Sequence, residues 1–338
     1  MSDKPFMTYS ALISLLERRG MVIDDHDRAR RKLQDVGYYR LSGFWYPCRK
    51  FLNDTNGQRI VSDVGGTVLR RADDFLAGTT FNKVFALYLF DKSLRLLMLD
   101  ALERVEICLR SLVAHEMGSH DPYAYTSTTF INPKWRIPKA GKTLSVWDAW
   151  SQKLTAQLAD SREDCICWYR AEHHDIPIWV SVQIWEFGTL SKYVSMLNGR
   201  YQNAVCKEIC SGLRPKDLNN WLHALNLLRN RCAHHNRIWN QSSMPLSFPQ
   251  SIDYFAQNAP LVDTTRLAGL IAVLWFLIRR MGPASTWLNR VETTLNSMPA
   301  GLPNCNMKAL GFTAGLHDTF EQLRANPAPA GTASSQTA

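Results

Sequence analysis

The sequence predicts an all-α fold, and three observations support this prediction. Apolar residues recur three and four positions apart along most of the 338-residue chain, which is the period of an amphipathic helix. Runs that alternate apolar and polar residues, as a half-buried strand requires, are scarce. Clusters of turn-forming residues, such as 53–57, 132–141 and 242–249, separate the periodic stretches. We therefore expect a series of amphipathic helices connected by loops.

Residues 1–79 are predicted to form a smaller N-terminal helical region. Short helices are expected around Tyr9–Arg19 and Asp25–Val36, and the aromatic cluster Gly37–Pro47 (GYYRLSGFWYP) follows them. Aromatic side chains at this density usually pack a core or a domain interface. The alternative is a surface on which nucleic-acid bases stack.

Residues 80–300 are predicted to form the main helical domain. Its first stretch, Thr80–Met117, has the spacing of one long amphipathic helix or of two abutting ones. The later predicted helices are Trp147–Leu158, Val180–Leu197, Leu218–His235, Thr264–Met281 and Ser285–Ser297. Residues 301–338 form a C-terminal extension, which is expected to be disordered from Asn326 because the tail lacks aromatic and β-branched aliphatic residues.

Composition and charge favour a cytoplasmic protein with a polyanionic partner. The net charge is +9, with 39 Lys and Arg against 30 Asp and Glu, and this excess suits RNA or DNA. The apolar runs are shorter than the roughly 18 to 20 residues that cross a bilayer, and the N-terminus does not resemble a secretory signal. The eight cysteines are scattered, and we expect reduced thiols. We expect no metal, no cofactor and no membrane association.

The segment 226–240 (NLLRNRCAHHNRIWN) carries the most informative side chains. An apolar stripe of the predicted helix consists of Trp221, Leu222, Leu225, Leu228 and Cys232. Asn230 and His234 are four residues apart and share a different face, so the amide can orient the imidazole. Arg229 projects within about 40° of Leu225, at the edge of the apolar stripe. A guanidinium in that place needs a partner, because burying an unpaired charge is costly.

These residue types suit a phosphate ligand. The guanidinium of Arg229 forks onto phosphate oxygens, the imidazole of His234 can transfer protons near neutral pH, and Arg231 and His235 add a second residue of each kind. In metal-independent RNA cleavage, a histidine deprotonates the ribose 2′-hydroxyl or protonates the leaving 5′-oxygen, and an arginine stabilises the phosphorane. The expected products are a 2′,3′-cyclic phosphate and a 5′-hydroxyl. The alternative is that these residues only bridge to acidic groups, which must come from elsewhere because 218–252 contains none.

Four ordered blocks resemble a known family. Arg229–His234 (RNRCAH) resembles the R-N-x-x-x-H motif of HEPN ribonucleases, and the longer string LRNRCAHHNRIWN resembles the Abi-like family of AbiD and AbiF abortive-infection proteins. The other three blocks are Gly37–Pro47, Leu102–His115 (LERVEICLRSLVAH) and Pro177–Leu190 (PIWVSVQIWEFGTL). The resemblance covers most of the chain, from about Tyr9 to Asn296.

The resemblance implies a HEPN-like helical bundle, a role in bacterial defence against phage, and an RNA target. It also implies catalytic positions for Arg229 and His234 and an orienting position for Asn230, whereas His235 either assists or simply packs. In HEPN nucleases two such motifs commonly meet across a dimer or between two domains of one chain. We therefore expect a homodimer with a composite site.

A second R-x-x-x-x-H spacing occurs at Arg110–His115 (RSLVAH) and is a candidate second half-site. The alternative is structural, because Glu106 lies one helical turn before Arg110 and can form an ion pair with it. The residue after Arg110 is Ser111, whereas Asn230 provides an amide in the first motif.

The leading hypothesis is an endoribonuclease that stays silent until infection and then cleaves host or phage RNA. The alternative is a non-catalytic RNA-binding protein that holds a structured small non-coding RNA. A third reading is a helical adaptor, in which Arg229 contributes to stability alone.

Overall fold

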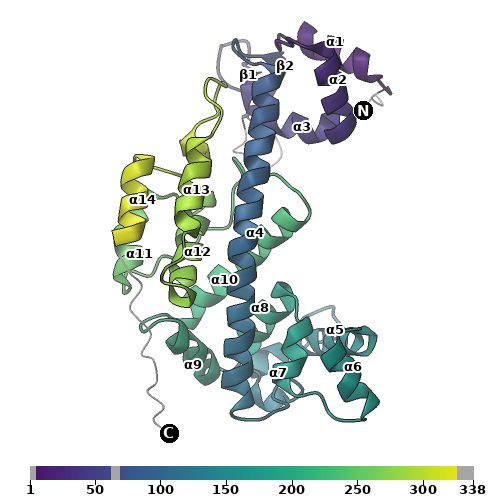
Figure 1. The fold of residues 1–338 in the computed structure, drawn as a ribbon, viewed down its shortest axis with the longest axis vertical. Helices are drawn as coiled ribbons and strands as arrows, with labels where there is room; N and C mark the ends of the chain where they lie inside the picture. Colours follow the sequence, from purple (N-terminus) through teal and green to yellow (C-terminus); the bar gives the residue numbers. More distant parts are fainter. Residues whose placement is uncertain (1–4, 62–68, 326–338) are drawn as a thin grey trace. The chain divides into compact units, whose positions relative to one another are not determined.

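The computed structural model describes residues 5–61 and 69–325, and these are mostly helical (Figure 1). The predicted all-α fold is confirmed apart from a small antiparallel sheet of β1 (Arg49–Phe51) and β2 (Arg71–Phe75), in which Arg49 pairs with Phe75. The α-helices are α1 (Tyr9–Arg18), α2 (His26–Val36), α3 (Tyr38–Trp45), α4 (Phe81–Gly118), α5 (Val146–Asp160), α6 (Asp164–Ala171), α7 (Ile178–Ser181), α8 (Phe187–Met196), α9 (Gly199–Ile209), α10 (Pro215–Ala233), α11 (Asp253–Asn258), α12 (Leu267–Met281), α13 (Trp287–Asn296) and α14 (Leu316–Ala325). The predicted disorder from Asn326 falls outside the described residues.

The chain divides into two compact units. The first comprises residues up to Leu96 together with 291–309, and the second comprises 97–290 together with the residues from Leu310 onward. The division falls within α4, so this helix contributes its first half to one unit and its second half to the other.

The first unit contains α1 to α3 and the sheet. Thr8 caps α1 and Asp25 caps α2, because each side chain accepts a hydrogen bond from a backbone N–H in the first turn. In the aromatic cluster, Phe44 and Trp45 are fully buried, whereas Tyr39 is 74% exposed. Most of the cluster's large apolar surface therefore packs into a core, as expected for aromatic side chains at this density.

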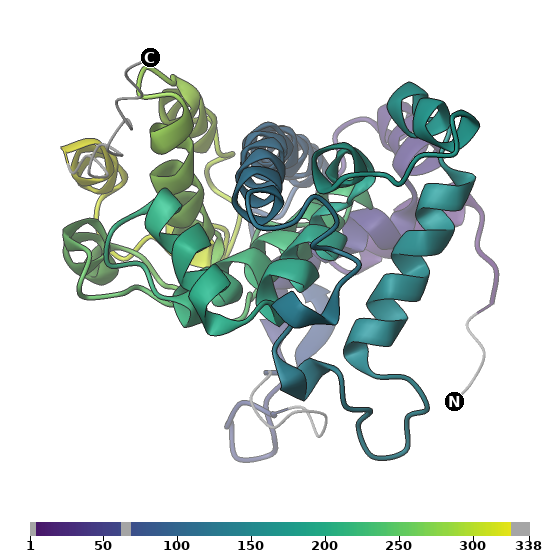
Figure 2. The same ribbon diagram turned by 90° about the horizontal axis from the view of Figure 1, so that it is seen from below.

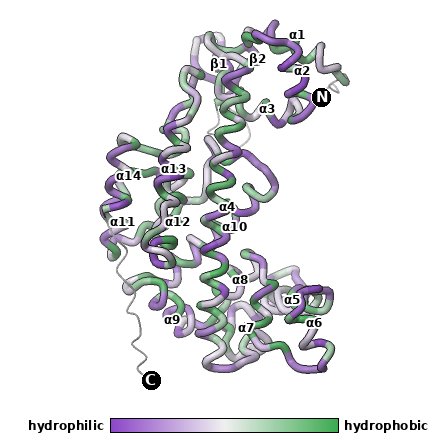
Figure 3. Tube along the Cα trace, in the orientation of Figure 1, coloured by the Kyte–Doolittle hydropathy of each residue, from purple (hydrophilic) through white to green (hydrophobic). Residues whose placement is uncertain are grey.

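Helix α4 is one continuous helix of 38 residues, which decides between the two alternatives that its sequence allows. Hydrophobic and hydrophilic residues are mixed along its whole length (Figure 3). Its buried positions in the second unit recur three and four residues apart and include Leu102, Val105, Leu109, Val113 and Met117. This spacing is the apolar stripe that the sequence predicts.

Helices of the second unit pack against the carboxyl-terminal half of α4, which Figure 2 views nearly along the helix axis. Residues of α9, α10 and α12 line an apolar cavity together with this half of α4. Helix α12 is buried without interruption from Leu267 to Ile278, so it forms the centre of the core. Helix α8 packs against α10. These contacts fix the positions of α4, α8 and α10.

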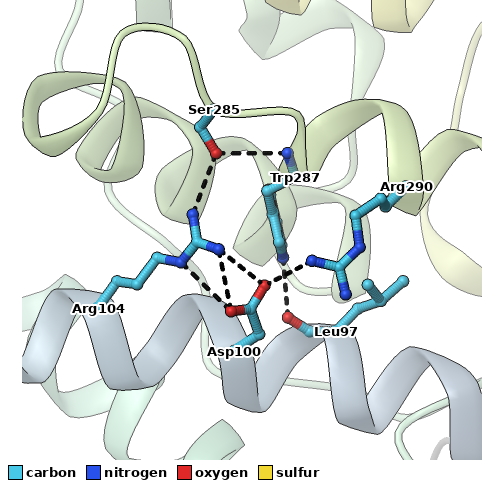
Figure 4. A network of polar contacts seen from close by, with 6 residues as sticks. All are labelled: Leu97, Asp100, Arg104, Ser285, Trp287 and Arg290. Atoms are coloured by element: carbon cyan, nitrogen blue, oxygen red, sulfur yellow. Dashed lines mark hydrogen bonds and ion pairs between the residues drawn. The ribbon is translucent and has the colours of Figure 1, made fainter.

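A polar network holds α4 to the start of α13 (Figure 4). Asp100 accepts hydrogen bonds at 3.1 Å from both Arg104 and Arg290. The indole N–H of Trp287 donates to the backbone carbonyl of Leu97 at 2.8 Å, and this indole is almost fully buried. The network anchors the turns of α4 that precede Glu106.

Two further expectations concern the described residues. No disulfide joins any of the eight cysteines, all of which lie in the described residues, in agreement with the predicted reduced thiols. Within residues 5–61 and 69–325, no helix combines the length and the hydropathy that crossing a membrane requires.

Candidate active site

Helix α10 carries the first part of the R-N-x-x-x-H motif. Pro215 occupies its first turn, where a missing N–H costs nothing, and Asp217 adds a negative charge near the helix N-terminus. The predicted apolar stripe of Trp221, Leu222, Leu225, Leu228 and Cys232 is buried. This burial fixes the rotation of α10 and leaves Arg229 half-buried at the edge of the stripe.

The helix ends two residues earlier than the sequence suggests, at Ala233. His235 has a φ of 58°, which is the left-handed region, and its N–H donates to the carbonyl of Cys232 at 3.1 Å. The N–H of Asn236 donates to the carbonyl of Arg231 at 2.8 Å. These two bonds form a Schellman motif, in which glycine usually occupies the left-handed position.

His234 is the C-cap residue of α10 and is exposed. Its backbone N–H donates to the carbonyl of Asn230 at 3.0 Å. The side chain of Asn230 accepts a hydrogen bond from Nη1 of Arg229 at 3.4 Å. Among the described residues, no side-chain bond joins Asn230 to His234. The amide of the motif therefore contacts the arginine and not the exposed imidazole.

The arginine of the motif lines a pocket together with carboxylates from α4. A pocket of about 320 Å³ is lined by Leu99, Leu102, Glu103, Glu106, Ile107, Arg110 and Arg229. Burial raises the pKa of Glu106, and the nearby charges of Arg110 and Arg229 oppose this shift. Glu106, from a distant part of the sequence, is therefore an acidic group whose charge acts on the half-buried Arg229, although its direct ion pair is with Arg110.

Arg110 is held by two kinds of partner. It forms the expected ion pair with Glu106 one turn earlier. Its Nε and Nη2 atoms also donate to the buried backbone carbonyl of Trp185, at 2.9 and 2.6 Å. The guanidinium thus connects α4 to the segment that leads into α8.

Arg110 also lines a second, larger pocket of about 570 Å³, together with His115, Trp179 and Gln183. The arginines of the two R-x-x-x-x-H segments therefore share one pocket, around Glu106. Their histidines are not brought together there: His115 lines the larger pocket, and in the described part of the chain His234 lines neither. His235 is exposed, and Arg231 donates to the carbonyl of Ser242 at 3.1 Å.

Sequence reasoning gives Glu106 the role of a simple ion-pair partner, whereas Glu106 is the centre of this site. A second missed residue is Glu186, whose charge further raises the pKa of Glu106 after the larger effect of burial. Glu186 itself pairs with Lys153 at 3.4 Å. The only sequence signal for Glu106 is its place one turn before Arg110. Nothing in the sequence indicates its approach to Arg229.

The family model described as Abi-like protein matches residues 31–240, which is more than half of the 338-residue chain. This range contains both R-x-x-x-x-H segments and Glu106. No curated protein and no solved structure matches the chain. The chain belongs to the Abi-like protein family.

Proposed function

We propose that this chain is an abortive-infection endoribonuclease that cleaves RNA in the bacterial cytoplasm without a metal ion, as a HEPN-type nuclease does. The observation that supports this most strongly is the pocket in which Arg229 and Arg110 both lie beside Glu106. Two guanidinium groups at one pocket are well suited to a phosphodiester, because each presents a planar set of donors to phosphate oxygens. Glu106 keeps them in place until the phosphate arrives.

Arg229 is the proposed stabiliser of the phosphorane that forms during cleavage. It needs to be positioned before the reaction, because electrostatic stabilisation is effective only when the dipoles and charges are already oriented. Its guanidinium donates a hydrogen bond to the side chain of Asn230, and the negative charge of Glu106 in the same pocket attracts it. Asn230 therefore acts as a positioning residue for Arg229 in this proposal.

His234 is the proposed proton-transfer group. It removes the proton from a ribose 2′-hydroxyl, and the resulting oxygen attacks the adjacent phosphorus. The bond from phosphorus to the 5′-oxygen then breaks, and that oxygen takes up a proton. One strand ends in a 2′,3′-cyclic phosphate and the other begins with a 5′-hydroxyl. The exposed place of His234 at the end of α10 leaves it accessible to a strand.

We propose that the complete site forms in a homodimer. His234 of one copy would act on a phosphate bound by Arg229 of the other, since His234 lies outside the Arg229 pocket within the described chain. The face beside this pocket carries exposed apolar side chains, with Ile107 at 55% and Trp179 at 47% exposure. Covering such side chains is the usual driving force for association.

The same observation supports the second candidate, a non-catalytic protein that holds a structured small RNA. Separated histidines and a pocket that presents two guanidinium groups would suffice for binding alone. Purification from cells and sequencing of bound RNA distinguishes the two functions. One abundant intact RNA that persists with wild-type protein, without cleavage of any other RNA, would favour binding.

The test of catalysis uses three variants of α10. Arg229→Ala and His234→Ala should abolish RNA cleavage, whereas His223→Ala, which removes an exposed histidine from the same helix, should retain it. EDTA should leave wild-type cleavage intact. Loss of cleavage on chelation, or equal activity of all three variants, would show that the mechanism is wrong.

A further inference from the structure

A basic pocket lies in the same unit as the Arg229 pocket. It has a volume of about 470 Å³, and four of its lining residues are Lys139, Lys142, Lys153 and Lys192. The first two come from the loop before α5, the third from α5 and the fourth from α8. Trp150, which is nearly buried, forms part of the wall. We call this the lysine pocket.

The lysine pocket has more positive charge than its surroundings neutralise. Lys153 pairs with Glu186 at 3.4 Å, but within the described parts of the chain no ion pair involves Lys139, Lys142 or Lys192. Burial lowers the pKa of Lys192, and the charge of Lys139 lowers it further. Lysines that repel each other in a partly buried pocket are stabilised by an anion.

The wall of the pocket holds an unused hydrogen-bonding group. Thr189 lines the pocket and is 4% exposed, and its hydroxyl has no hydrogen-bond partner among the described residues. A buried hydroxyl without a partner is uncommon, because its desolvation is not offset. The amino-terminal end of α5, from Ser145, also lines the pocket and adds the partial positive charge of a helix N-terminus.

Residues 185–189 connect the lysine pocket to Arg110 of the Arg229 pocket. Trp185 accepts hydrogen bonds from Arg110 through its backbone carbonyl, and Thr189 follows four residues later. Glu186 lies between them in sequence. It forms an ion pair with Lys153 of the lysine pocket, and its negative charge raises the pKa of Glu106 in the Arg229 pocket.

We propose that the lysine pocket binds backbone phosphates of the single-stranded RNA whose scissile phosphate enters the Arg229 pocket, an inference that rests on the proposed function. Lysine ammonium groups bind phosphates as point charges without reading sequence. The pocket then increases affinity for RNA without taking part in bond cleavage.

The test compares two triple variants that remove the same charge. One is Lys139→Gln, Lys142→Gln and Lys192→Gln; the other, on exposed lysines elsewhere, is Lys207→Gln, Lys216→Gln and Lys308→Gln. The probe is a fluorescent 2′-O-methyl oligouridylate, which lacks the nucleophile and stays intact. Its affinity is measured by anisotropy over a range of salt concentrations.

The pocket variant should bind at least about tenfold more weakly, and the slope of log K against log salt should fall by about two, since each lost single-strand phosphate contact removes about 0.7. The control should bind like the wild type. Equal weakening of both variants, or none, would overturn the proposal. So would displacement of the RNA from the wild type by ATP at low concentration, because that result identifies a nucleotide site.

Cleavage kinetics separate this proposal from the proposed function. If the wild type cleaves RNA and the pocket variant has a raised KM with an unchanged kcat, both proposals are supported. If the pocket variant cleaves with an unchanged KM, the lysine pocket proposal is wrong and catalysis stands. In a third outcome, the wild type binds RNA without cleaving it, while the pocket variant binds more weakly and the control variant does not. In that case the proposed catalysis is wrong and the proposed role of the lysine pocket stands.

Discussion

Arg229 of α10 and Glu106 of α4 line the same pocket, although they are far apart in the sequence. The charge of Arg229 lowers the pKa of Glu106 against the larger effect of burial, which raises it. Arg110 shares the same carboxylate through a direct ion pair. The R-N-x-x-x-H segment is therefore connected electrostatically to the second R-x-x-x-x-H segment through one glutamate.

The raised pKa of Glu106 predicts a dependence of stability on pH. The ordinary pKa is 4.5 and the folded value is higher, so between these values the native protein holds a proton that the unfolded chain has released. The free energy of unfolding then falls as pH rises through this interval, by a contribution that Glu106→Gln removes. Urea unfolding of both proteins at several pH values above 4.5 measures it. Parallel curves for wild type and variant would contradict the prediction.

Replacing Arg110 should destabilise the fold. Arg110→Ala leaves the buried carbonyl of Trp185 without its donor and Glu106 without its ion pair, and we expect a loss of about 2 kcal/mol. The matched control is Arg104→Ala on the same helix, whose ion pair with Asp100 is more exposed and should contribute less than about 1 kcal/mol. Denaturant unfolding measures both values. A larger loss for Arg104→Ala would show that the Trp185 contact is unimportant.

The left-handed conformation of His235 predicts different effects of two substitutions. His235→Gly and His235→Val both remove the imidazole, but valine is strained at a φ of 58°. The valine variant should therefore unfold about 1 to 2 kcal/mol more easily than the glycine variant. Equal stability of the two variants would indicate that the Schellman motif does not persist in solution.

A composite site predicts complementation between inactive chains. Neither Arg229→Ala nor His234→Ala should cleave RNA alone. In a mixed dimer of the two, one site combines an intact Arg229 with an intact His234 from the other copy. Random mixing of both chains should therefore restore about one quarter of wild-type activity. No recovery from mixed, co-refolded chains would place both residues in the site of a single chain.

The sequence predicts elements well where a local pattern decides them. The period of apolar residues predicts Thr80–Met117, and the helix spans Phe81–Gly118. The Glu106–Arg110 ion pair follows from one-turn spacing and is confirmed. The end of α10 is predicted less well, because the residue that stops the helix in the left-handed region is His235, where the usual signal is glycine.

The sites depend on contacts between distant segments, and no local pattern contains them. The sequence places Arg229 at the edge of an apolar stripe, where its charge requires a compensating group. Only the folded structure shows that Glu106 of α4 lines the same pocket as Arg229. The lysine pocket is a similar case. Lys139 and Lys142 are close in sequence, whereas Lys192 joins them because α8 lies beside the start of α5.

The chemistry of the cleaved ends distinguishes attack by the ribose 2′-hydroxyl from metal-dependent hydrolysis. Wild-type protein is incubated with a defined RNA in excess EDTA, and the fragments are analysed by mass spectrometry. Attack by the 2′-hydroxyl predicts fragments that end in a 2′,3′-cyclic phosphate and fragments that begin with a 5′-hydroxyl, and both should be absent with Arg229→Ala. Fragments with 3′-hydroxyl and 5′-phosphate ends, or no cleavage in EDTA by a protein that cleaves without it, would show that Arg229 and His234 do not catalyse metal-independent cleavage.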